Sequence, residues 1–483
     1  MKNSDVLAGL DLGSSVAEND ANLASYFIPT VALNDFLGDR FDLIRGVKGS
    51  GKSALLRVVS TRQADYAKLR DVLLHVATEH TGEPSFKRAF GTLRPGEYSE
   101  AALVSAWKTY LLNLALDALE GYSSSSEASE AIAFAQKIGI RYKTTSPYKK
   151  VMWSLLRILH LKSFTVGADS VQAEFPDAPP EIWTKHEEVI DFPEALRLCV
   201  SAFRSLGIRC WILVDRLDAA FQDDYDLERA ALKALLMAYK DFMGHSELRL
   251  KLFFRTDLFD QVTSETGFRE LTHVLDRTSP PMLWDQDRLL SMIMERFVFN
   301  ESIRDKYGVT QQDMRDSELR ETTFFSIFPG QIDQGSRKSD SWSWINSRIR
   351  DSNGIRTPRD LHTLVINSVR KQQEFLAIEG DDNAETLISP GAVKAGLTQL
   401  SVDKVRTVLI AENAHLEKSI RAFQRGKAEH NEESLAQLLG EGWPVTTEAL
   451  ERIGFLEHVG ESWKIPMLYR DGLEITQGAA FEK

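Results

Sequence analysis

The stretch IRGVKGSGKSALLRVV, residues 44–59, decides the fold. It matches the pattern G-x-x-x-x-G-K-[ST] without deviation, with apolar residues before it and helical apolar spacing after it. Glycines let backbone N–H groups approach phosphate oxygens, the lysine ammonium binds the outer phosphates, and the serine hydroxyl ligates Mg²⁺. The pattern therefore predicts a strand, a phosphate-binding loop and a helix whose positive end faces the anion. The residues expected to bind nucleotide are Gly46, Lys48, Gly49, Ser50, Gly51, Lys52, Ser53 and Ala54.

A second apolar strand supplies an acidic partner. In CWILVDRLDAAF (210–221), four apolar residues precede Asp215, which we expect to hold a Mg²⁺-bound water. The hydroxyl of Ser53 is expected to ligate the same ion directly. Arg216 follows directly. Asp218 is the nearest further carboxylate, and it fits equally a role beside the attacking water or a helix cap or surface acid. The expected cofactors are ATP and Mg²⁺. No N-K-x-D motif for guanine is present, and this gives only a weak preference for adenine.

Two arginines are further site candidates. RLKLFFRTDLF (249–259) predicts a strand ending at Arg255, near the γ-phosphate, or else paired locally with Asp257. Arg277 precedes a predicted fifth core strand and could reach the nucleotide of a neighbouring subunit. Arg269 competes for that role, and a plain surface arginine fits Arg277 as well.

Composition restricts the remaining classes. The chain has 483 residues, 43% hydrophobic and 27% charged, which fits two to four globular domains. Two cysteines form no disulfide framework or zinc site, so a reducing cytoplasm is expected. We expect no secretion signal and no membrane span. No H-x-x-x-H or C-x-x-C pattern supports a metal nuclease or deaminase, and the net charge of −12 disfavours a broad phosphate-binding surface.

The chain divides into four predicted parts. Residues 1–25 are expected to be flexible. Residues 26–284 form an α/β core, a parallel sheet flanked by helices, with a helical insertion at about 85–190 that includes 99–119 and 148–161. Residues 285–400 form a helical lid, and residues 401–483 form a small C-terminal domain. A single helix is expected from about residue 390 to 424.

Four motifs together resemble the AAA+/STAND-like P-loop ATPases of bacteria: GVKGSGKSALL, ILVDRLD, LFFRTDLF and IRTPRDLHTLV (355–365). The resemblance is strongest to a P-loop ATPase family named after a cyanobacterial protein, with GxKGSGKSAL and DxLD signatures. It implies that Arg359 contacts the γ-phosphate from the lid, as the sensor-2 arginine does. It also implies that 447–473 belong to a winged helix. Many relatives carry a second acid where this chain has Arg216, a departure that puts the hydrolysis rate in question.

The resemblance implies a role in bacterial defence or stress signalling. The first hypothesis is a regulatory ATPase whose partners are further copies of this chain, a protein effector, or both. A DNA-acting loader or remodelling ATPase is the second, and a scaffold with slowly hydrolysed nucleotide is the third. Residues 401–483 hold ten Lys/Arg and fourteen Asp/Glu, a net of −4, so nucleic acid is the weaker partner expectation. The one basic cluster there is Arg421, Arg425 and Lys427, and no membrane partner is expected.

Overall fold

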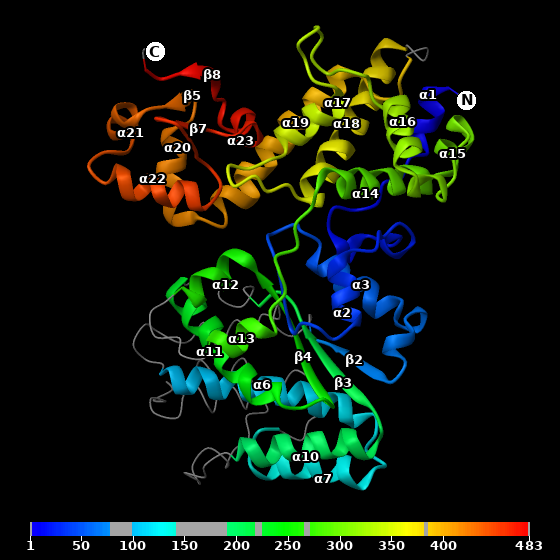
Figure 1. The fold of residues 1–483 in the computed structure, drawn as a ribbon, viewed down its shortest axis with the longest axis vertical. Helices are drawn as coiled ribbons and strands as arrows, with labels where there is room; N and C mark the ends of the chain where they lie inside the picture. The colour runs from blue at the N-terminus through cyan, green and yellow to red at the C-terminus, as the bar shows by residue number, and fades with distance from the viewer. Residues whose placement is uncertain are drawn as a thin grey trace, which may run out of the picture. The chain divides into compact units, whose positions relative to one another are not determined.

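The computed structural model describes residues 2–77, 99–141, 191–217, 225–264, 271–380 and 385–481. The chain forms two compact units (Figure 1). One contains Met1–Ile28, Lys48–Ala54 and Leu283–Lys483, and the other contains Pro29–Val47 and Leu55–Met282. The predicted lid and C-terminal domain therefore share one unit, which also takes in the N-terminal segment and most of the phosphate loop.

A parallel sheet organises the second unit. Its strands are β1 (Leu43–Gly46), β2 (Val72–Val76), β3 (Arg209–Val214) and β4 (Leu248–Arg255), in the order β1-β4-β3-β2. Strands β1, β3 and β4 coincide with strands predicted above from apolar runs, as expected where both faces of a sheet are covered. The predicted fifth strand is only partly formed. The segment after residue 277 runs along the free side of β1, with one parallel bridge between Leu43 and Thr278.

Successive side chains of each strand point to opposite faces of the sheet, and helices pack on both faces. Residues such as Ile212 and Leu252 face the core cluster that includes α6 (Glu100–Glu120), α10 (Phe192–Ser205) and α11 (Tyr225–Met243). On the other face, Phe36 of α2 (Val31–Leu37) packs edge-on against Trp211, with ring centroids 5.4 Å apart. The remaining helices of this part are α3 (Lys52–Thr61), α7 (Ser126–Lys137), α12 (Thr256–Thr263) and α13 (Leu271–Asp276).

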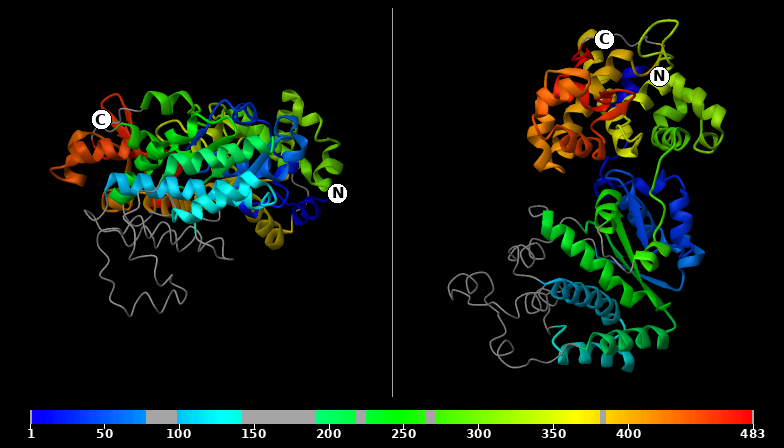
Figure 2. Two further views of the ribbon diagram at one scale, coloured as in Figure 1. Left: turned by 90° about the horizontal axis from the view of Figure 1, so that it is seen from below. Right: turned by 60° about the vertical axis from the view of Figure 1, so that its left-hand side comes forward.

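The described part of the helical insertion belongs to the core. In α6, Trp107 and Tyr110 are fully buried, and Trp107 Nε1 donates to the carbonyl of Ala231 at 2.7 Å. Helix α7 lies alongside α10 (Figure 2). Ser125, one of the four consecutive serines Ser123–Ser126, caps the start of α7. The predicted helix at 148–161 lies outside the described residues.

The first unit is mainly helical. Its helices are α1 (Asn3–Ala8), α14 (Gln286–Phe299), α15 (Glu301–Tyr307), α16 (Ser317–Ile327), α17 (Ser341–Arg348), α18 (Pro358–Glu379), α19 (Pro390–Lys404), α20 (Glu417–Ala422), α21 (Glu432–Leu439), α22 (Trp443–Arg452) and α23 (Met467–Arg470). The two units together also contain short 3-10 turns at Ala17–Asn19, Leu23–Ser25, Gln63–Asp65, Ala67–Leu69, Asp313–Arg315, Ala414–Leu416 and Asp471–Leu473. No helix among the described residues is long and apolar enough to cross a bilayer.

A small second sheet lies near the C-terminus. Its strands are β5 (Lys427–His430), β6 (Glu457–Val459), β7 (Ser462–Lys464) and β8 (Thr476–Ala479), in the order β6-β7-β5-β8. The helices α21 and α22 precede the β6–β7 hairpin in the chain (Figure 1).

The expected single helix over 390–424 is wrong. Helix α19 ends at Lys404 and passes into a π-helical turn, Val405–Ile410, before the chain leaves helical geometry near Asn413. The turn contains Val405, Thr407, Val408 and Ile410, whose branched side chains have restricted rotamers in a helix. Such π-turns are frequent at functional sites.

The N-terminal segment is also ordered, contrary to expectation. Helix α1 buries Val6 and Leu7, and Leu12 is buried behind it. Arg296 on α14 donates to the Leu12 carbonyl at 2.6 Å and pairs with Asp20 at 2.9 Å. Residues 2–25 therefore pack as part of the first unit.

Candidate phosphate-binding site

The phosphate loop has the backbone that its glycines predict. Strand β1 ends at Gly46 and helix α3 begins at Lys52, so the predicted order of strand, loop and helix is confirmed. Gly49 and Gly51 have φ angles of 85° and 100°. Because L side chains rarely adopt such angles, both positions require glycine. Lys52, Ser53 and Ala54 form the first turn of α3, where the helix dipole favours an anion.

Helix α18 lies against this loop. A Cβ added at Gly49 would come within 3.0 Å of the Arg359 Cβ and 3.3 Å of the Thr357 Oγ1. Thr357 caps α18 by accepting from the Asp360 N–H at 3.1 Å, and Pro358 occupies the favoured first turn. The sequence-predicted Arg359 therefore stands beside the loop, within the same compact unit.

Two buried polar atoms here have no hydrogen-bond partner among the described residues. They are Ser50 Oγ and Arg359 Nε. Unsatisfied buried polar groups cost about 1–3 kcal/mol each and call for an explanation. The Ser50 carbonyl, by contrast, accepts from Trp284 Nε1 at 2.8 Å. A glycine cradle with an orphaned guanidinium nitrogen and an orphaned hydroxyl fits a phosphate group.

Asp215 follows the carboxyl end of β3 in the second unit, and it is 4% exposed. It accepts the backbone N–H of Arg216 at 2.9 Å, and Arg216 has a positive φ of 56°. In parallel sheets, ligands bind beyond the carboxyl ends of the strands, where β1 also ends. A carboxylate oxygen such as that of Asp215 is a ligand type that suits Mg²⁺. Asp218 lies outside the described residues.

Arg255 is the last residue of β4 and stands in register with Gly46. Its guanidinium forms an ion pair with Asp257, with Nη2 2.6 Å from Oδ2 and Nε 3.2 Å from Oδ1. The local pairing considered from the sequence is therefore present. The arginine nevertheless stands at the carboxyl edge of the sheet, where the phosphate loop begins.

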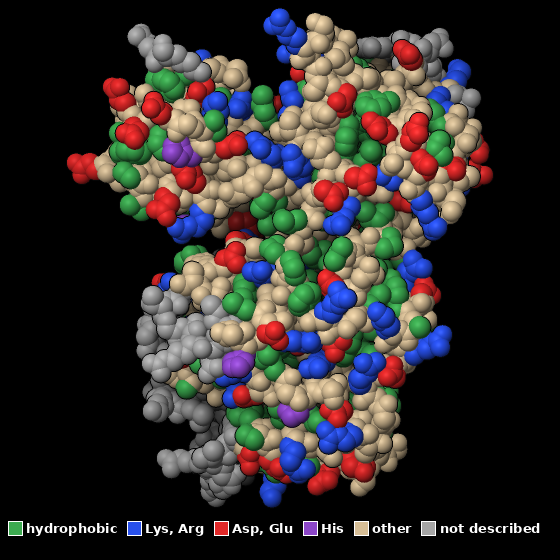
Figure 3. Space-filling view, viewed as in Figure 1, with side chains coloured by type: hydrophobic (Ala, Val, Ile, Leu, Met, Phe, Trp, Pro, Cys, Tyr) green, Lys and Arg blue, Asp and Glu red, His purple; other side chains and the backbone are tan. Residues whose placement is uncertain are grey.

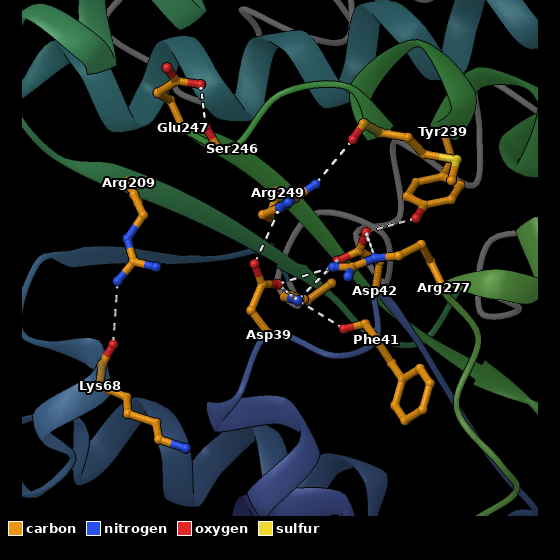
Figure 4. A network of polar contacts seen from close by, with 12 residues as sticks. Asp39, Phe41, Asp42, Lys68, Arg209, Tyr239, Ser246, Glu247, Arg249 and Arg277 are labelled. Atoms are coloured by element: carbon orange, nitrogen blue, oxygen red, sulfur yellow. Dashed lines mark hydrogen bonds and ion pairs between the residues drawn. The ribbon is translucent and has the colours of Figure 1, made fainter. Parts of the chain in front are cut away.

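Arg277, the other arginine considered, is paired with carboxylates of its own unit. It lies at the opposite, amino end of β1, where its Nη2 is 2.9 Å from Asp42 Oδ1 and 3.2 Å from Asp39 Oδ1 (Figure 4). Lys251, fully buried, also pairs with Asp42 at 2.9 Å. Burial would raise the pKa of Asp42, but Lys251 and Arg277 outweigh it and lower that pKa. Arg277 is thus held in a structural ion network. The competing Arg269 lies outside the described residues.

Sequence reasoning missed two contacts of the loop. The ammonium of Lys48 forms an ion pair with Glu412, beyond the π-turn, and lies 3.5 Å from the Thr407 carbonyl. Trp284, which comes shortly before α14 in the chain, donates its Nε1–H to the Ser50 carbonyl. No motif links such distant positions, since Lys48 and Glu412 are 364 residues apart in the chain.

The C-terminal basic cluster is largely neutralised. Arg421 pairs with Glu417 at 2.7 Å, and Arg425 pairs with Glu474 at 3.0 Å. On the face seen in Figure 3, acidic side chains lie over α21 and α22. Between residues 431 and 464, the exposed acidic residues are Glu432, Glu433, Glu441, Glu448 and Glu461.

Comparison with known proteins gives little. No family model matches the sequence. No curated protein sequence matches it either. A solved structure of a Walker-type ATPase of Pyrococcus abyssi aligns over 96% of this chain and 98% of its own, with 12% identity and a TM-score of 0.39. A likeness at this level supports no inference, so the function must be derived from the loop and its contacts.

Proposed function

We propose that this chain is a Mg-ATP-binding regulatory ATPase. One observation carries the proposal: a loop with two positive-φ glycines joins β1 to α3, and an arginine with an orphaned, buried Nε lies against it. Backbone N–H groups and the Lys52 ammonium would hold the β- and γ-phosphates. Ser53 and Asp215 would hold Mg²⁺, which neutralises charge on the phosphates.

Arg359 gives the chain a means of distinguishing nucleotides. A protein whose lid arginine contacts the γ-phosphate binds ATP more tightly than ADP. A nucleotide can switch a protein between two conformations only if it binds them with different affinities, and such an arginine provides that difference. Because Thr357 and Arg359 contact the loop at Gly49, the first turn of α18 would respond to the bound phosphates. Arg255 is the second candidate for a γ-phosphate contact.

The biological setting is proposed from the resemblance of the motifs to bacterial AAA+/STAND-like ATPases. On that basis, ATP binding and hydrolysis would control assembly or a protein effector in defence or stress signalling. Helix α22 and the β6–β7 hairpin would belong to a winged helix, as the resemblance of residues 447–473 implies. Its acidic exposed residues favour a protein partner over duplex DNA.

The test is the Lys52→Ala variant. We expect it to lose detectable binding of a fluorescent ATP analogue and to lose phosphate release, because the loop's central positive charge is gone. Lys371→Ala is the control, since Lys371 pairs at the surface with Glu374 on α18. The proposal fails if Lys52→Ala binds and hydrolyses ATP like the wild type.

A second candidate, a scaffold that retains nucleotide with slow turnover, is favoured by Arg216. That residue occupies the position after Asp215, and its N–H is bonded to the Asp215 carboxylate. Chromatography of the acid-released nucleotide from purified protein would distinguish the two functions. Stoichiometric ATP after purification indicates the scaffold, whereas continuing phosphate release indicates the ATPase.

A further inference from the structure

Helix α19 and its π-turn connect the phosphate loop with the C-terminal sheet region. At the end beyond the π-turn, Glu412 pairs with Lys48 of the loop. Within α19, Lys404 pairs with Asp360 on α18 at 2.8 Å. Further back, the Ser401 hydroxyl accepts from the Gly472 N–H at 2.8 Å. All these residues belong to one compact unit.

The packing of α19 on the C-terminal segment is tight. A Cβ at Gly472 would come within 2.5 Å of the Ser401 carbonyl, so only glycine allows this approach. Thr398 Oγ1 also donates to Asp471 Oδ2 at 2.7 Å. Two residues separate strand β8 from the turn Asp471–Leu473, so a shift of α19 would displace residues next to the C-terminal sheet.

Glu412 places a negative charge beside a loop suited to anions. Its side chain is 18% exposed, and its carboxylate is one lysine side chain away from the loop backbone. A triphosphate held by that backbone would repel this carboxylate and attract the Lys48 ammonium. Ion pairing with Glu412 and phosphate binding would therefore compete for Lys48.

We propose that Glu412 is a positioning residue that holds Lys48 until a triphosphate competes for it, so that nucleotide binding releases the π-turn and α19 reports this to the C-terminal sheet. This rests on the proposed nucleotide-binding function. The proposal predicts the direction of the change in ATP affinity. Removing the Glu412 charge should increase the affinity, whereas loss of a merely structural contact would decrease it.

The experiment compares Glu412→Gln with wild type in equilibrium binding of ATP and ADP. We expect ATP to bind about fivefold more tightly to the variant at low salt, with a smaller gain for ADP. The gain should shrink only partly in ~1 M salt, because the Glu412 side chain is 18% exposed and salt screens such a charge less than an exposed one. Glu448→Gln is the matched control, since it removes the same charge from an exposed pair with Arg452 on α22.

A second measurement tests whether nucleotide binding at the loop changes the C-terminal sheet. Hydrogen exchange in 405–412 and 471–479 should increase when a slowly hydrolysed ATP analogue binds wild type. In Glu412→Gln it should already be raised without nucleotide. Glu412→Ala serves as the second variant if Glu412→Gln does not fold.

Unchanged or weaker ATP binding by folded Glu412→Gln would overturn the inference, as would a gain equal to that of Glu448→Gln. If wild type itself binds no nucleotide, the proposed function fails instead, so the two failures are distinguishable.

Discussion

At the scale of single residues, Gly49 is constrained twice. Its φ of 85° strains any L side chain, and a Cβ would meet Arg359 at 3.0 Å. The first constraint concerns folding, and the second concerns how closely α18 approaches the loop. Substitution at this position therefore tests whether that approach matters for binding.

We expect Gly49→Ala to lower ATP affinity about tenfold and to cost roughly 1 kcal/mol of folding free energy. Gly308→Ala is the control, because Gly308 has a φ of 64° and open space around its Cβ. It should carry the folding cost alone. Titration calorimetry and thermal unfolding measure the two effects, and equal ATP affinity in both variants would contradict the prediction.

The phosphate-binding residues of the loop could be predicted from their spacing in the sequence, because such a loop is built from consecutive residues. Lys52 and Gly49 were assigned in this way, and Arg359 through the TPRDL resemblance. Arg277 lies in an ion network at the amino end of β1, which residue order along the chain could not show, and its reach to a neighbouring subunit's nucleotide stays a prediction. Glu412 and Trp284 gave no signal, because their roles exist only through long-range packing.

At the scale of elements, a buried ion network joins β1, β4 and the segment beside β1. Lys251, Asp42 and Arg277 connect them at the amino edge of the sheet. Removing Arg277 would leave the buried Asp42 with Lys251 but without its second cation, so its charge would be less fully compensated. This edge is opposite the one that carries the phosphate loop.

We therefore expect Arg277→Ala to destabilise the protein by about 2 kcal/mol, which is less than the ~3–5 kcal/mol for a fully buried pair because Arg277 is partly exposed. ATP affinity of the folded variant should not change. Arg40→Ala, which removes an exposed pair with Asp35, should cost well under 1 kcal/mol. Denaturant unfolding and ATP titration provide the measurements. A selective loss of ATP turnover in Arg277→Ala would instead support the predicted role at a neighbouring subunit's nucleotide.

The turn before α18 contains a carboxyl group that should make stability depend on pH. Burial raises the pKa of Asp351 to about 6, even though it accepts the Ile355 N–H at 2.8 Å. A folded-state pKa above the unfolded value means that the native state binds the proton more tightly. Stability is therefore lost as pH rises from about 4 through about 6.

Asp351→Asn keeps the hydrogen-bond acceptor and removes the ionisation. We expect it to stabilise the protein at pH 7.5 by at most about 3 kcal/mol and to have little effect at pH 3.5. Thermal unfolding across this range measures the difference. A variant that is equally stabilised at both pH values would show that the ionisation of Asp351 is not the cause.

Elements differed in how well the sequence predicted them. The strands β1 to β4 follow apolar runs, because a parallel sheet covered on both faces needs apolar side chains throughout. The continuous helix over 390–424 was wrong, because apolar spacing does not register the local change to π geometry at Val405–Ile410. Cys199 and Cys210 are buried free thiols, and burial raises the pKa of each to about 12, so neither is prone to react.

At the scale of the whole molecule, segments far apart in the chain form one unit. The N-terminal 28 residues, the phosphate loop and the last two hundred residues pack together. Arg296, His362 and the Leu12 carbonyl illustrate this packing. Burial and then Arg296 lower the pKa of His362 to about 3, so its ring stays neutral and Nε2–H donates to that carbonyl. A linear division into four domains could not capture such an arrangement.

The charge of the whole molecule bears on the DNA-acting alternative. DNA binding depends on cations that displace counterions from phosphates, and here the net charge is −12. Arg421 and Arg425, the core of the C-terminal basic cluster, already pair with Glu417 and Glu474. Each such arginine would have to leave a carboxylate before it could contact a phosphate.

We therefore expect duplex DNA at micromolar concentration neither to bind the protein at ~150 mM salt nor to stimulate ATP turnover. Fluorescence anisotropy with a labelled duplex and phosphate release with and without DNA are the measurements, repeated at ~50 mM salt. Glu474→Gln is the informative variant, since it releases Arg425 from its pair; even this variant should gain only weak binding that vanishes with salt. Salt-resistant binding by the wild type, with faster ATP hydrolysis, would instead make duplex DNA the partner of the C-terminal region.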